Sequence, residues 1–349
     1  MKKIVSLYLL FAILINQANA QDIDFKAWLQ PSSAQSIFQQ EGYYVWCGSV
    51  TKGNDNAYYL FYSRWPKKAG FKGWVTHSEV AVARSKSPTG PFKFVKVALG
   101  KRDKQYWDAD VTHNPTVHHF NGRYYLYYMG NYGNGEFWNN RNHQRIGVAV
   151  AKHPLGPWVR MNEPVIDVDS ANNDSHDYLM TSNPAICKTN DGRYVMVYKS
   201  VSKGPMPFGG MVYHKVAFAN GPTGPFIKTT NPVFQKDTVR FAAEDPYIWR
   251  QHNKYWALVK DFKGSFTGQN LSLALFESKD AISWQVAKHP LASTMNIQFT
   301  DTTWKATKVE RPQLLVENGI PKVLYVAVMM ENEETFNIAI PLKVPGSKK

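Results

Sequence analysis

A short motif of two polar residues followed by proline recurs through the chain at nearly constant spacing. It occurs as His113-Asn114-Pro115, Ser182-Asn183-Pro184, Glu244-Asp245-Pro246 and Glu310-Arg311-Pro312. The four prolines are 69, 62 and 66 residues apart. Self-similarity at a fixed period of tens of residues indicates a repeat architecture, in which each unit is one supersecondary structure. The repeat therefore limits the possible folds more than any other feature of the sequence.

Other elements recur with the same period. Each motif is followed by an aromatic or β-branched run, such as "RYYLYYMG" from Arg123 and "RYVMVYKS" from Arg193, and "YYLFYSRW" from Tyr58 lies one period earlier. A "GPF" or "GPW" turn at Pro91, Pro157 and Pro225 follows a further apolar run in three units. Short apolar runs bounded by Gly, Asn and Asp turns predict β-strands joined by hairpins.

Together these elements predict an all-β fold, a five-bladed β-propeller with four-stranded antiparallel blades. Each blade spans about 66 residues. The last blade is short, so we expect the segment from Asp22 to Gln40 to supply its closing strand. A β-sandwich is the alternative fold, but sandwiches rarely show one period this regular.

The N-terminus has the features of an export signal. Lys2 and Lys3 precede an apolar run from Ile4 to Ile15, and Ala18-Asn19-Ala20 fits a small-residue cleavage site. We expect residues 1–20 to be a cleavable signal peptide and residues 21–349 to be a single propeller catalytic domain. The protein should be exported, either periplasmic or secreted. No later segment reaches the roughly 18 apolar residues of a membrane span, so none is expected.

The charge and aromatic content point to an anionic sugar. Lys and Arg number 41 against 27 Asp and Glu, a formal net charge of +14, and aromatic residues make up 14% of the chain. Such a positive surface attracts anions. Nucleic acid is not expected, because the sequence has no basic run longer than two residues and no zinc-finger or helix-turn-helix signature. An anionic oligosaccharide explains the same charge, and aromatic side chains line many sugar sites.

The sequence gives little sign of a metal or a disulfide. Cys47 and Cys187 are the only cysteines, and they lack the spacing of a zinc site. We expect two buried free thiols, with one disulfide as the alternative. No cofactor is expected to be required. Because propeller channels often hold a divalent ion, a central cation stays open.

The candidate site lies where the strands of different blades converge. In a propeller the innermost strands line the axis, so their starts, the ends of the second strands and the starts of the third strands share one face. This places imidazole, amide, carboxylate and cationic groups together, as in a sugar site. The candidate catalytic residues are His113, His77, Glu244 and Glu310. The candidate substrate-binding residues are Arg64, Asn114, Asn183, Lys199, Asp245, Lys260, Arg311, Trp46 and Trp65.

Several of these residues have a purely structural alternative. His113 and His77 could be satisfied core histidines, and Glu310 with Arg311 could form an ion pair between blades. Proline is tolerated at the start of a strand in any β protein, and the polar residue before it could only cap a turn. Lys199 and Lys260 are more informative, because a lysine is seldom placed at the end of an inner strand without a partner for its charge.

On the blade period and the polar-polar-proline strand starts, the chain resembles the five-bladed propeller enzymes of the glycoside hydrolase family 43 type, over roughly residues 40 to 345. The resemblance implies three carboxylates: an Asp base on the first blade, an Asp on the second blade that tunes pKa, and a Glu acid on the third. The corresponding places hold Trp46-Cys47, His113-Asn114 and Ser182-Asn183. All three carboxylates are therefore missing.

Without those acids, the strand starts offer histidine, amides and cations, which suit chemistry next to a sugar carboxylate. Removal of the proton beside a uronic acid carboxylate needs a cation to neutralise that carboxylate, a base such as histidine, and an acid for the leaving oxygen. The chain is also similar to the secreted oligosaccharide dehydratases of ulvan-type degradation. We therefore expect elimination of water from a non-reducing-end uronic acid, which gives a 4,5-unsaturated uronate.

Two other functions stay open from the sequence. The first is an exo-acting glycoside hydrolase on a sulfated or uronate-bearing polysaccharide, built from Glu244, Asp245 or Glu310. Inverting hydrolysis needs a carboxylic acid and a carboxylate about 6.5 to 9.5 Å apart. The second is a non-catalytic propeller that binds glycans.

Overall fold

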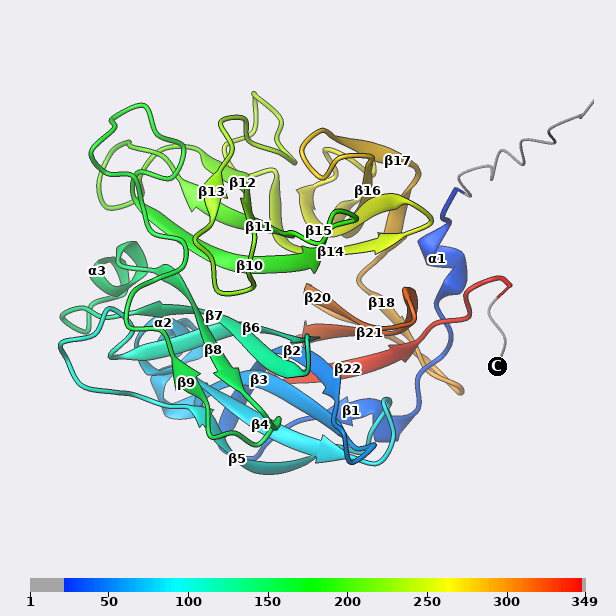
Figure 1. Cartoon of the computed structure of the whole chain (residues 1–349). Coiled ribbons are helices and arrows are strands. Elements are labelled where there is room, and N and C mark those ends of the chain that lie inside the picture. Colours follow the sequence, from blue (N-terminus) through cyan, green and yellow to red (C-terminus); the bar gives the residue numbers. More distant parts are fainter. Residues whose placement is uncertain (1–21, 347–349) are drawn as a thin grey trace, which may run out of the picture.

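The computed structural model describes residues 22–346, and the predicted signal peptide lies outside them. Five four-stranded antiparallel sheets surround one axis, which confirms the predicted propeller (Figure 1). Within residues 22–346, no helix combines the length and the apolar character that crossing a membrane requires.

The blades follow one another along the chain, and each runs from an inner to an outer strand. Blade 1 contains β2 (Tyr43–Lys52), β3 (Tyr58–Pro66), β4 (Glu79–Ser85) and β5 (Lys93–Leu99). Blade 2 contains β6 (Val111–Phe120), β7 (Arg123–Asn131), β8 (Arg145–Ala151) and β9 (Val159–Arg160). Blade 3 contains β10 (Met180–Lys188), β11 (Tyr194–Val201), β12 (Val212–Ala219) and β13 (Ile227–Lys228). Blade 4 contains β14 (Ala243–Gln251), β15 (Lys254–Lys263), β16 (Asn270–Ser278) and β17 (Trp284–Ser293).

Blade 5 is built from both ends of the described residues. Its inner strands are β20 (Lys308–Glu317), β21 (Ile320–Met329) and β22 (Thr335–Pro341), and the outer strand is β1 (Ile37–Phe38). Ile37 pairs with Ile338, and Phe38 pairs with Asn337. In Figure 1 the blue β1 lies beside the red β22. This confirms that the segment before residue 40 supplies the closing strand, which joins the two ends of the ring.

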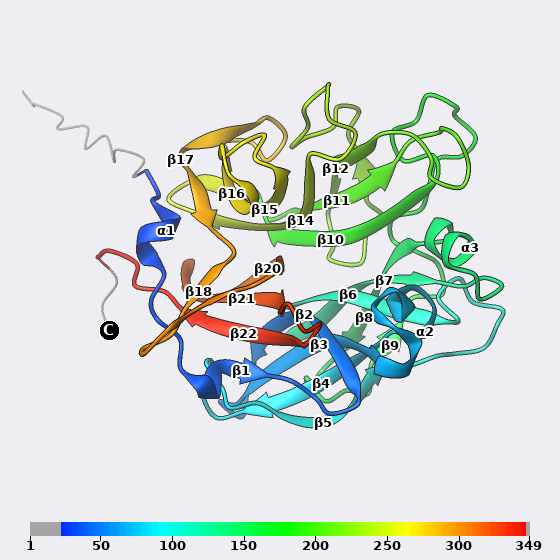
Figure 2. The same ribbon diagram turned by 180° about the vertical axis from the view of Figure 1, so that it is seen from behind.

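The remaining elements are short insertions. They are α1 (Phe25–Trp28), α2 (Trp74–His77), α3 (Phe137–Asn142), the hairpin of β18 (Asn296–Gln298) and β19 (Thr303–Lys305), and three 3-10 helices at Ala34–Ser36, Lys67–Ala69 and Phe71–Gly73. The helix α2 connects β3 to β4, and α3 connects β7 to β8, so both lie at the end of the disk where the inner strands begin. We call this end the mouth. Figure 2 shows α2 and α3 next to each other there.

The core lies between the blades rather than in one central mass. Each of five large apolar clusters combines residues from two neighbouring blades, and the cluster between blades 4 and 5 also takes in Phe25 and Trp28 of α1. The aromatic residues of the second strands, such as Tyr127 and Tyr198, are fully buried in these layers. Both cysteines are free and buried, as expected. Packing between sheets thus holds the inner strands close to the axis.

A β-bulge interrupts every inner strand, at the polar-polar-proline motif in blades 2 to 5 and at the equivalent Trp46-Cys47-Gly48 in blade 1. The register shifts between Trp46 and Ser49 in β2, and at the corresponding place in β6, β10, β14 and β20. The second motif residue has a positive φ in all five blades: Cys47 (57°), Asn114 (52°), Asn183 (54°), Asp245 (56°) and Arg311 (56°). A bulge leaves its extra residue unpaired, which accommodates a proline in the strand, and it re-aims the local side chains.

Closure by β1 should be needed for stability. Phe38 is buried and packs edge-on against Tyr62, with ring centroids 4.7 Å apart. We expect Phe38→Ala to lower the free energy of unfolding by about 3 kcal/mol, because it leaves a cavity between blades 5 and 1. Phe208→Ala, at a phenylalanine that is 51% exposed, should cost less than about 0.5 kcal/mol. Urea unfolding of both variants checks this, and equal losses would contradict a structural role for the closing strand.

Candidate active site

A cavity of about 220 Å³ opens at the mouth on the propeller axis. We call it the axial pocket. All five inner strands and two of the connecting loops contribute to it. It is lined by Trp46, Trp65, Phe71, Trp74, His113, Asn114, Gln144, Asn183, Lys199, Glu244, Asp245, Phe262, Lys308, Glu310 and Arg311.

Most of the candidate residues from the sequence meet in this pocket. The motif residues of the five inner strands converge there because they occupy equivalent bulges around one axis. The candidates that line the pocket are His113, Glu244, Glu310, Asn114, Asn183, Lys199, Asp245, Arg311, Trp46 and Trp65. The structure brings together residues that lie more than 260 positions apart in the chain.

The re-aimed side chains form a chain of hydrogen bonds across the blades. Cys47 Sγ donates to Asn114 Oδ1 (2.8 Å), Asn114 Nδ2 donates to Asn183 Oδ1 (2.5 Å), and Asn183 Nδ2 donates to Asp245 Oδ1 (2.6 Å). Burial raises the pKa of the Cys47 thiol, which keeps it protonated as a donor. We call Cys47, Asn114, Asn183, Asp245 and Arg311 the axial chain. Its donors all point toward Asp245.

The axial chain ends in a buried ion pair between blades 4 and 5. Arg311 donates to Asp245 from its backbone N (3.2 Å) and from Nη1 (3.2 Å). Arg311 is 1% exposed, and its Nε and Nη2 have no hydrogen-bond partner among the described residues. An unpaired buried N–H of a charged group is costly. The floor of the pocket therefore holds a charge-balanced ion pair whose guanidinium has unused donors.

His113 is held as a neutral base. Its Nδ1 lies 2.8 Å from Ser78 Oγ, its ring stacks on Trp74 at 5.0 Å, and Trp65 lies edge-on at 5.6 Å. Burial, reinforced by Arg311 and Lys199, holds the pKa of His113 well below its usual range. When Nδ1 donates to Ser78, Nε2 keeps a lone pair, so His113 can accept a proton at that atom.

The three pocket carboxylates differ in their partners. Glu244 forms an ion pair with Lys199, and Asp245 forms one with Arg311. The side chain of Glu310 makes no hydrogen bond or ion pair with the described residues. Burial raises the pKa of Glu310 to about 7; Lys308 opposes this shift, while Asp245 and Glu244 add to it. Glu310 is therefore suited to carry a proton near neutral pH and to act as an acid.

One cation in the pocket is unpaired. Lys308 forms no ion pair with a described carboxylate, and its Nζ lies 5.1 Å from the ring of Phe71. It precedes Glu310 by two positions in β20, so the two side chains share one face of the strand. An ammonium group beside an aromatic wall can bind an anionic group on a sugar.

Three candidate residues do not line the axial pocket, so the placement expected from the sequence was wrong for them. Arg64 pairs with Glu79 (2.8 Å) and lies between the rings of Tyr43 and Phe94, 4.5 Å from each centroid. Successive residues of a strand point to opposite faces. Because Trp65 faces the pocket, Arg64 faces away from it.

Lys260 and His77 lie outside the axial pocket for different reasons. Lys260 is fully buried and donates to the carbonyl oxygens of Leu271 (2.7 Å) and Val309 (2.9 Å), and burial lowers its pKa to about 8. It holds blades 4 and 5 together instead of facing the cavity. His77 ends α2 instead of starting a strand, and it is exposed, with Nδ1 2.7 Å from Thr76 Oγ1.

Five lining residues were not candidates from the sequence: Phe71, Trp74, Gln144, Phe262 and Lys308. Phe71 and Trp74 come from the connection between β3 and β4, which the repeat did not assign to any strand. Lys308 could have been predicted from the sequence, because it lies two positions before Glu310 and side chains two apart in a strand face the same side. Gln144 immediately precedes β8, and its Nε2 is buried without a hydrogen-bond partner among the described residues.

A central cation finds little support in the donor set. The described residues contain no group of three or more His, Cys, Asp or Glu side chains arranged to hold a metal ion. The oxygens of Asn114, Asn183 and Asp245 already accept hydrogen bonds in the axial chain. The guanidinium of Arg311 beside them would repel a cation. These residues do not fit a metal site.

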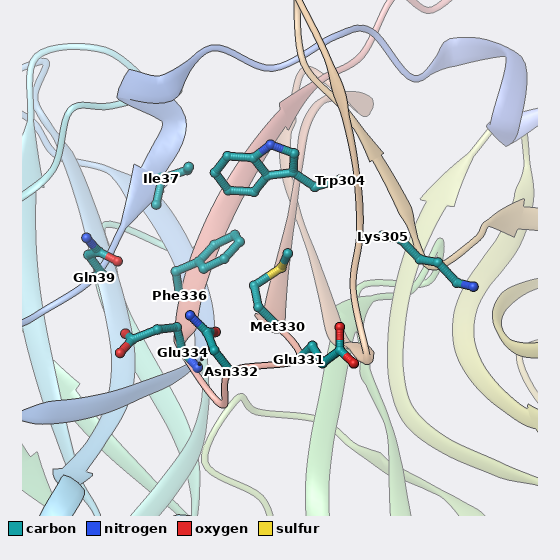
Figure 3. Close-up of a pocket in the computed structure, with 9 residues that line it drawn as sticks. All are labelled: Ile37, Gln39, Trp304, Lys305, Met330, Glu331, Asn332, Glu334 and Phe336. Atoms are coloured by element: carbon teal, nitrogen blue, oxygen red, sulfur yellow. Dashed lines mark hydrogen bonds between the residues drawn. The ribbon is translucent and has the colours of Figure 1, made fainter.

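A larger cavity of about 620 Å³ lies at the edge of blade 5 and has a different character. Figure 3 shows Trp304, Phe336, Met330 and Ile37 around it. Of its acidic residues, Glu334 forms an ion pair with Lys67 (2.8 Å). Its walls are apolar and it holds no histidine, so we place the chemistry in the axial pocket.

Comparison with known proteins supports the fold assignment. Residues 92–187 match the family model of the glycosyl hydrolases family 43. This segment runs from the outer strand of blade 1 through blade 2 to the inner strand of blade 3. It includes two of the places where that family's carboxylates were expected, and these hold His113-Asn114 and Ser182-Asn183. No curated protein matches the sequence significantly.

Solved structures match almost the whole chain. They include a complex of BT0996 and RGII (TM-score 0.66, 15% identity, 93% of this protein and 95% of that one). A family 117 glycoside hydrolase, Zg3597 from the marine bacterium Zobellia galactanivorans, has a TM-score of 0.61 at 17% identity, over 90% of this protein and 89% of that one. An endo-arabinase from Bacteroides thetaiotaomicron has a TM-score of 0.57 at 12% identity, over 92% of this protein and 100% of that one. The protein thus has the five-bladed propeller fold of these glycoside hydrolase structures.

The placement of Arg64 can be tested. We expect Arg64→Ala to lower the free energy of unfolding by about 2 kcal/mol, because a buried charge-assisted hydrogen bond to Glu79 is lost. Lys308→Ala should leave stability within about 0.5 kcal/mol, since Lys308 makes no ion pair. Urea unfolding measures both effects. A stable Arg64→Ala protein with impaired substrate binding would instead support the placement first expected from the sequence.

Proposed function

We propose that this protein is a carbohydrate-active enzyme that eliminates water from the non-reducing-end uronic acid of an anionic oligosaccharide, giving a 4,5-unsaturated uronate. One observation carries the proposal. Glu244 and Asp245 are neutralised by Lys199 and Arg311, which leaves a neutral imidazole, a protonatable carboxyl and an unpaired lysine facing the cavity. That set matches the base, the acid and the carboxylate clamp of an elimination.

The proposed reaction uses three of these groups. Lys308 binds the carboxylate of the uronic acid, so negative charge that develops next to it is stabilised. Nε2 of His113 takes the proton from C5, the C5–H electrons form the C4=C5 double bond, and the C4–O bond breaks. Glu310 gives its proton to the departing oxygen, which leaves as water. His113 then releases its proton to solvent, and Glu310 takes up a proton from solvent.

Substrate binding favours this protonation scheme. His113 is a weak base in the empty pocket because burial, together with Arg311 and Lys199, opposes its positive charge. A bound carboxylate adds negative charge nearby and raises the pKa of the imidazole. Trp46 and Trp74 line the walls, where they can contact the apolar face of a sugar ring, whereas Trp65 is fully buried.

A glycoside hydrolase is the second candidate. The match of residues 92–187 to a hydrolase family favours it, and Glu310 would serve as its acid. Such an enzyme also needs an ionised carboxylate that is free to activate water. Glu244 could fill that role only by giving up its ion pair with Lys199. We therefore rank hydrolysis below elimination.

Product analysis separates these functions. We expect the purified protein to convert a saturated, uronate-ended, sulfated-rhamnose oligosaccharide into a product lighter by about 18 mass units, with rising ultraviolet absorbance from the conjugated double bond. The loss corresponds to one water molecule per chain end. Release of a saturated monosaccharide would indicate the hydrolase instead. Saturable binding without any product would indicate a glycan-binding propeller.

The pH dependence of kcat/KM should show the ionisation of Glu310. Because the acid must be protonated and burial raises its pKa to about 7, we expect kcat/KM to fall as the pH rises through about 7. Glu310→Gln should lower kcat by about 10² to 10⁴-fold and abolish that limb of the profile. His113→Gln should cause a loss of similar size.

Glu331→Gln is the matched control, since this exposed glutamate lies outside the axial pocket, and it should leave the profile unchanged. Glu244→Gln separates the two chemistries. It should abolish turnover if Glu244 activates water, and it should be the milder change under elimination. An unaltered pH profile in Glu310→Gln would refute the assigned acid.

A further inference from the structure

A second cavity of about 470 Å³ lies beside the axial pocket at the mouth, over blades 2 and 3. Its walls come from α3, from the segment before β10 and from the connection between β11 and β12. They include Trp138, Asn142, His143, Arg145, Tyr178 and Met206. We call it the outer groove. The three groups of the proposed elimination lie outside it.

The outer groove neighbours the axial pocket. Gln144 lines the axial pocket, while its direct neighbours His143 and Arg145 line the outer groove. A series of ring contacts follows the same course. Trp74, which stacks on His113, contacts Phe137 at 6.2 Å, and Phe137 contacts Trp138 at 5.0 Å.

Apolar side chains are exposed along the outer groove: Trp138 and Met206 line it, and Phe208 follows Pro207 of its wall. Trp138 is 37% exposed, Phe208 51% and Met206 67%. Trp138 and Phe208 pack edge to face at 4.9 Å, so they form one aromatic surface. Exposed apolar surface gathered beside a polar cavity marks a binding site.

The charged groups of the outer groove are mostly engaged within the protein. Arg145 binds Asp167 (2.5 Å), and Arg141 lies over the Trp138 ring at 5.7 Å while it donates to Asn142 Oδ1 (2.9 Å). Arg141 thereby fixes the indole in place. The Tyr178 hydroxyl makes no hydrogen bond to the described residues. Recognition here depends on ring stacking and neutral hydrogen bonds rather than on ion pairs.

We propose that the outer groove is a second sugar subsite, in which the third and later sugar rings, counted from the reacting uronic acid, stack on Trp138 with Phe208 packed beside it. This inference rests on the proposed function for the identity of the oligosaccharide, but the stacking surface is independent of the reaction in the axial pocket. It implies that the protein prefers oligosaccharides of three or more sugars over a disaccharide.

The test compares a disaccharide with a tetrasaccharide, both uronate-ended and built on sulfated rhamnose. We expect Trp138→Ala to raise KM for the tetrasaccharide about tenfold, with kcat unchanged and with the disaccharide unaffected. Trp138→Phe should recover part of the loss. Trp304→Ala is the matched control, because Trp304 is also 37% exposed but lines the cavity on blade 5. It should change neither KM.

Calorimetric binding of the same two oligosaccharides keeps this test separate from the test of the reaction. If no product forms but the tetrasaccharide binds about tenfold more tightly than the disaccharide, and Trp138→Ala removes that difference, the subsite stands and the elimination fails. If product forms while both oligosaccharides bind equally, or if Trp138→Ala behaves like Trp304→Ala, the subsite is refuted. Binding of neither oligosaccharide refutes both proposals.

Discussion

The functional end of this propeller depends on five equivalent bulges whose second residue has a left-handed backbone. A non-glycine residue in that conformation costs of the order of 1 to 3 kcal/mol and persists only where the surroundings hold it. Here the surroundings are the axial chain from Cys47 through Asn114, Asn183 and Asp245 to Arg311. The strained backbone turns one side chain per blade toward the others, and the hydrogen bonds between these side chains stabilise the strained conformation. One position per blade thereby decides the chemistry at the axis.

The direction of those hydrogen bonds explains how a buried charge is tolerated. Every donor in the axial chain points toward Asp245, which also binds Arg311. A pair of opposite buried charges is stable only when its remaining lone pairs and protons are satisfied. The carboxylate meets this condition, but the guanidinium does not, because Nε and Nη2 stay unpaired among the described residues. The pair is balanced in charge but leaves two donors unused, and burial, reinforced by Arg311 and Lys199, lowers the pKa of His113.

The sequence was enough to predict the fold and the convergence of the motif residues, because both follow from a period. The closing strand was predictable as well, since blade 5 lacked one. The errors arose where a residue departs from its repeat: Arg64 lies one position beyond Ser63, which is the counterpart of Lys199 in the strand register, and so points the other way. Trp74 and Phe71 belong to a connection whose sequence is not repeated in the other units, so no period could locate them. Lys260 has the same register as Lys199, but only the packing of blade 5 determines that its ammonium binds backbone carbonyls.

The interior of the channel bears on which part of a glycan can react. Farther along the inner strands, Thr116 Oγ1 donates to Gln313 Oε1 (2.9 Å) across the axis, and His118 lies beside Thr116 and faces the ring of Tyr247. These side chains fill the axis beneath the axial chain, so a polysaccharide cannot thread through the disk. A sugar that reaches His113 must enter and leave by the mouth. For the proposed glycan substrate, only a chain end would fit above Arg311 and Asp245, and the rest of the glycan would turn outward over a blade. Closure of the channel therefore favours action at a terminal residue, which is what elimination at a non-reducing-end uronic acid requires.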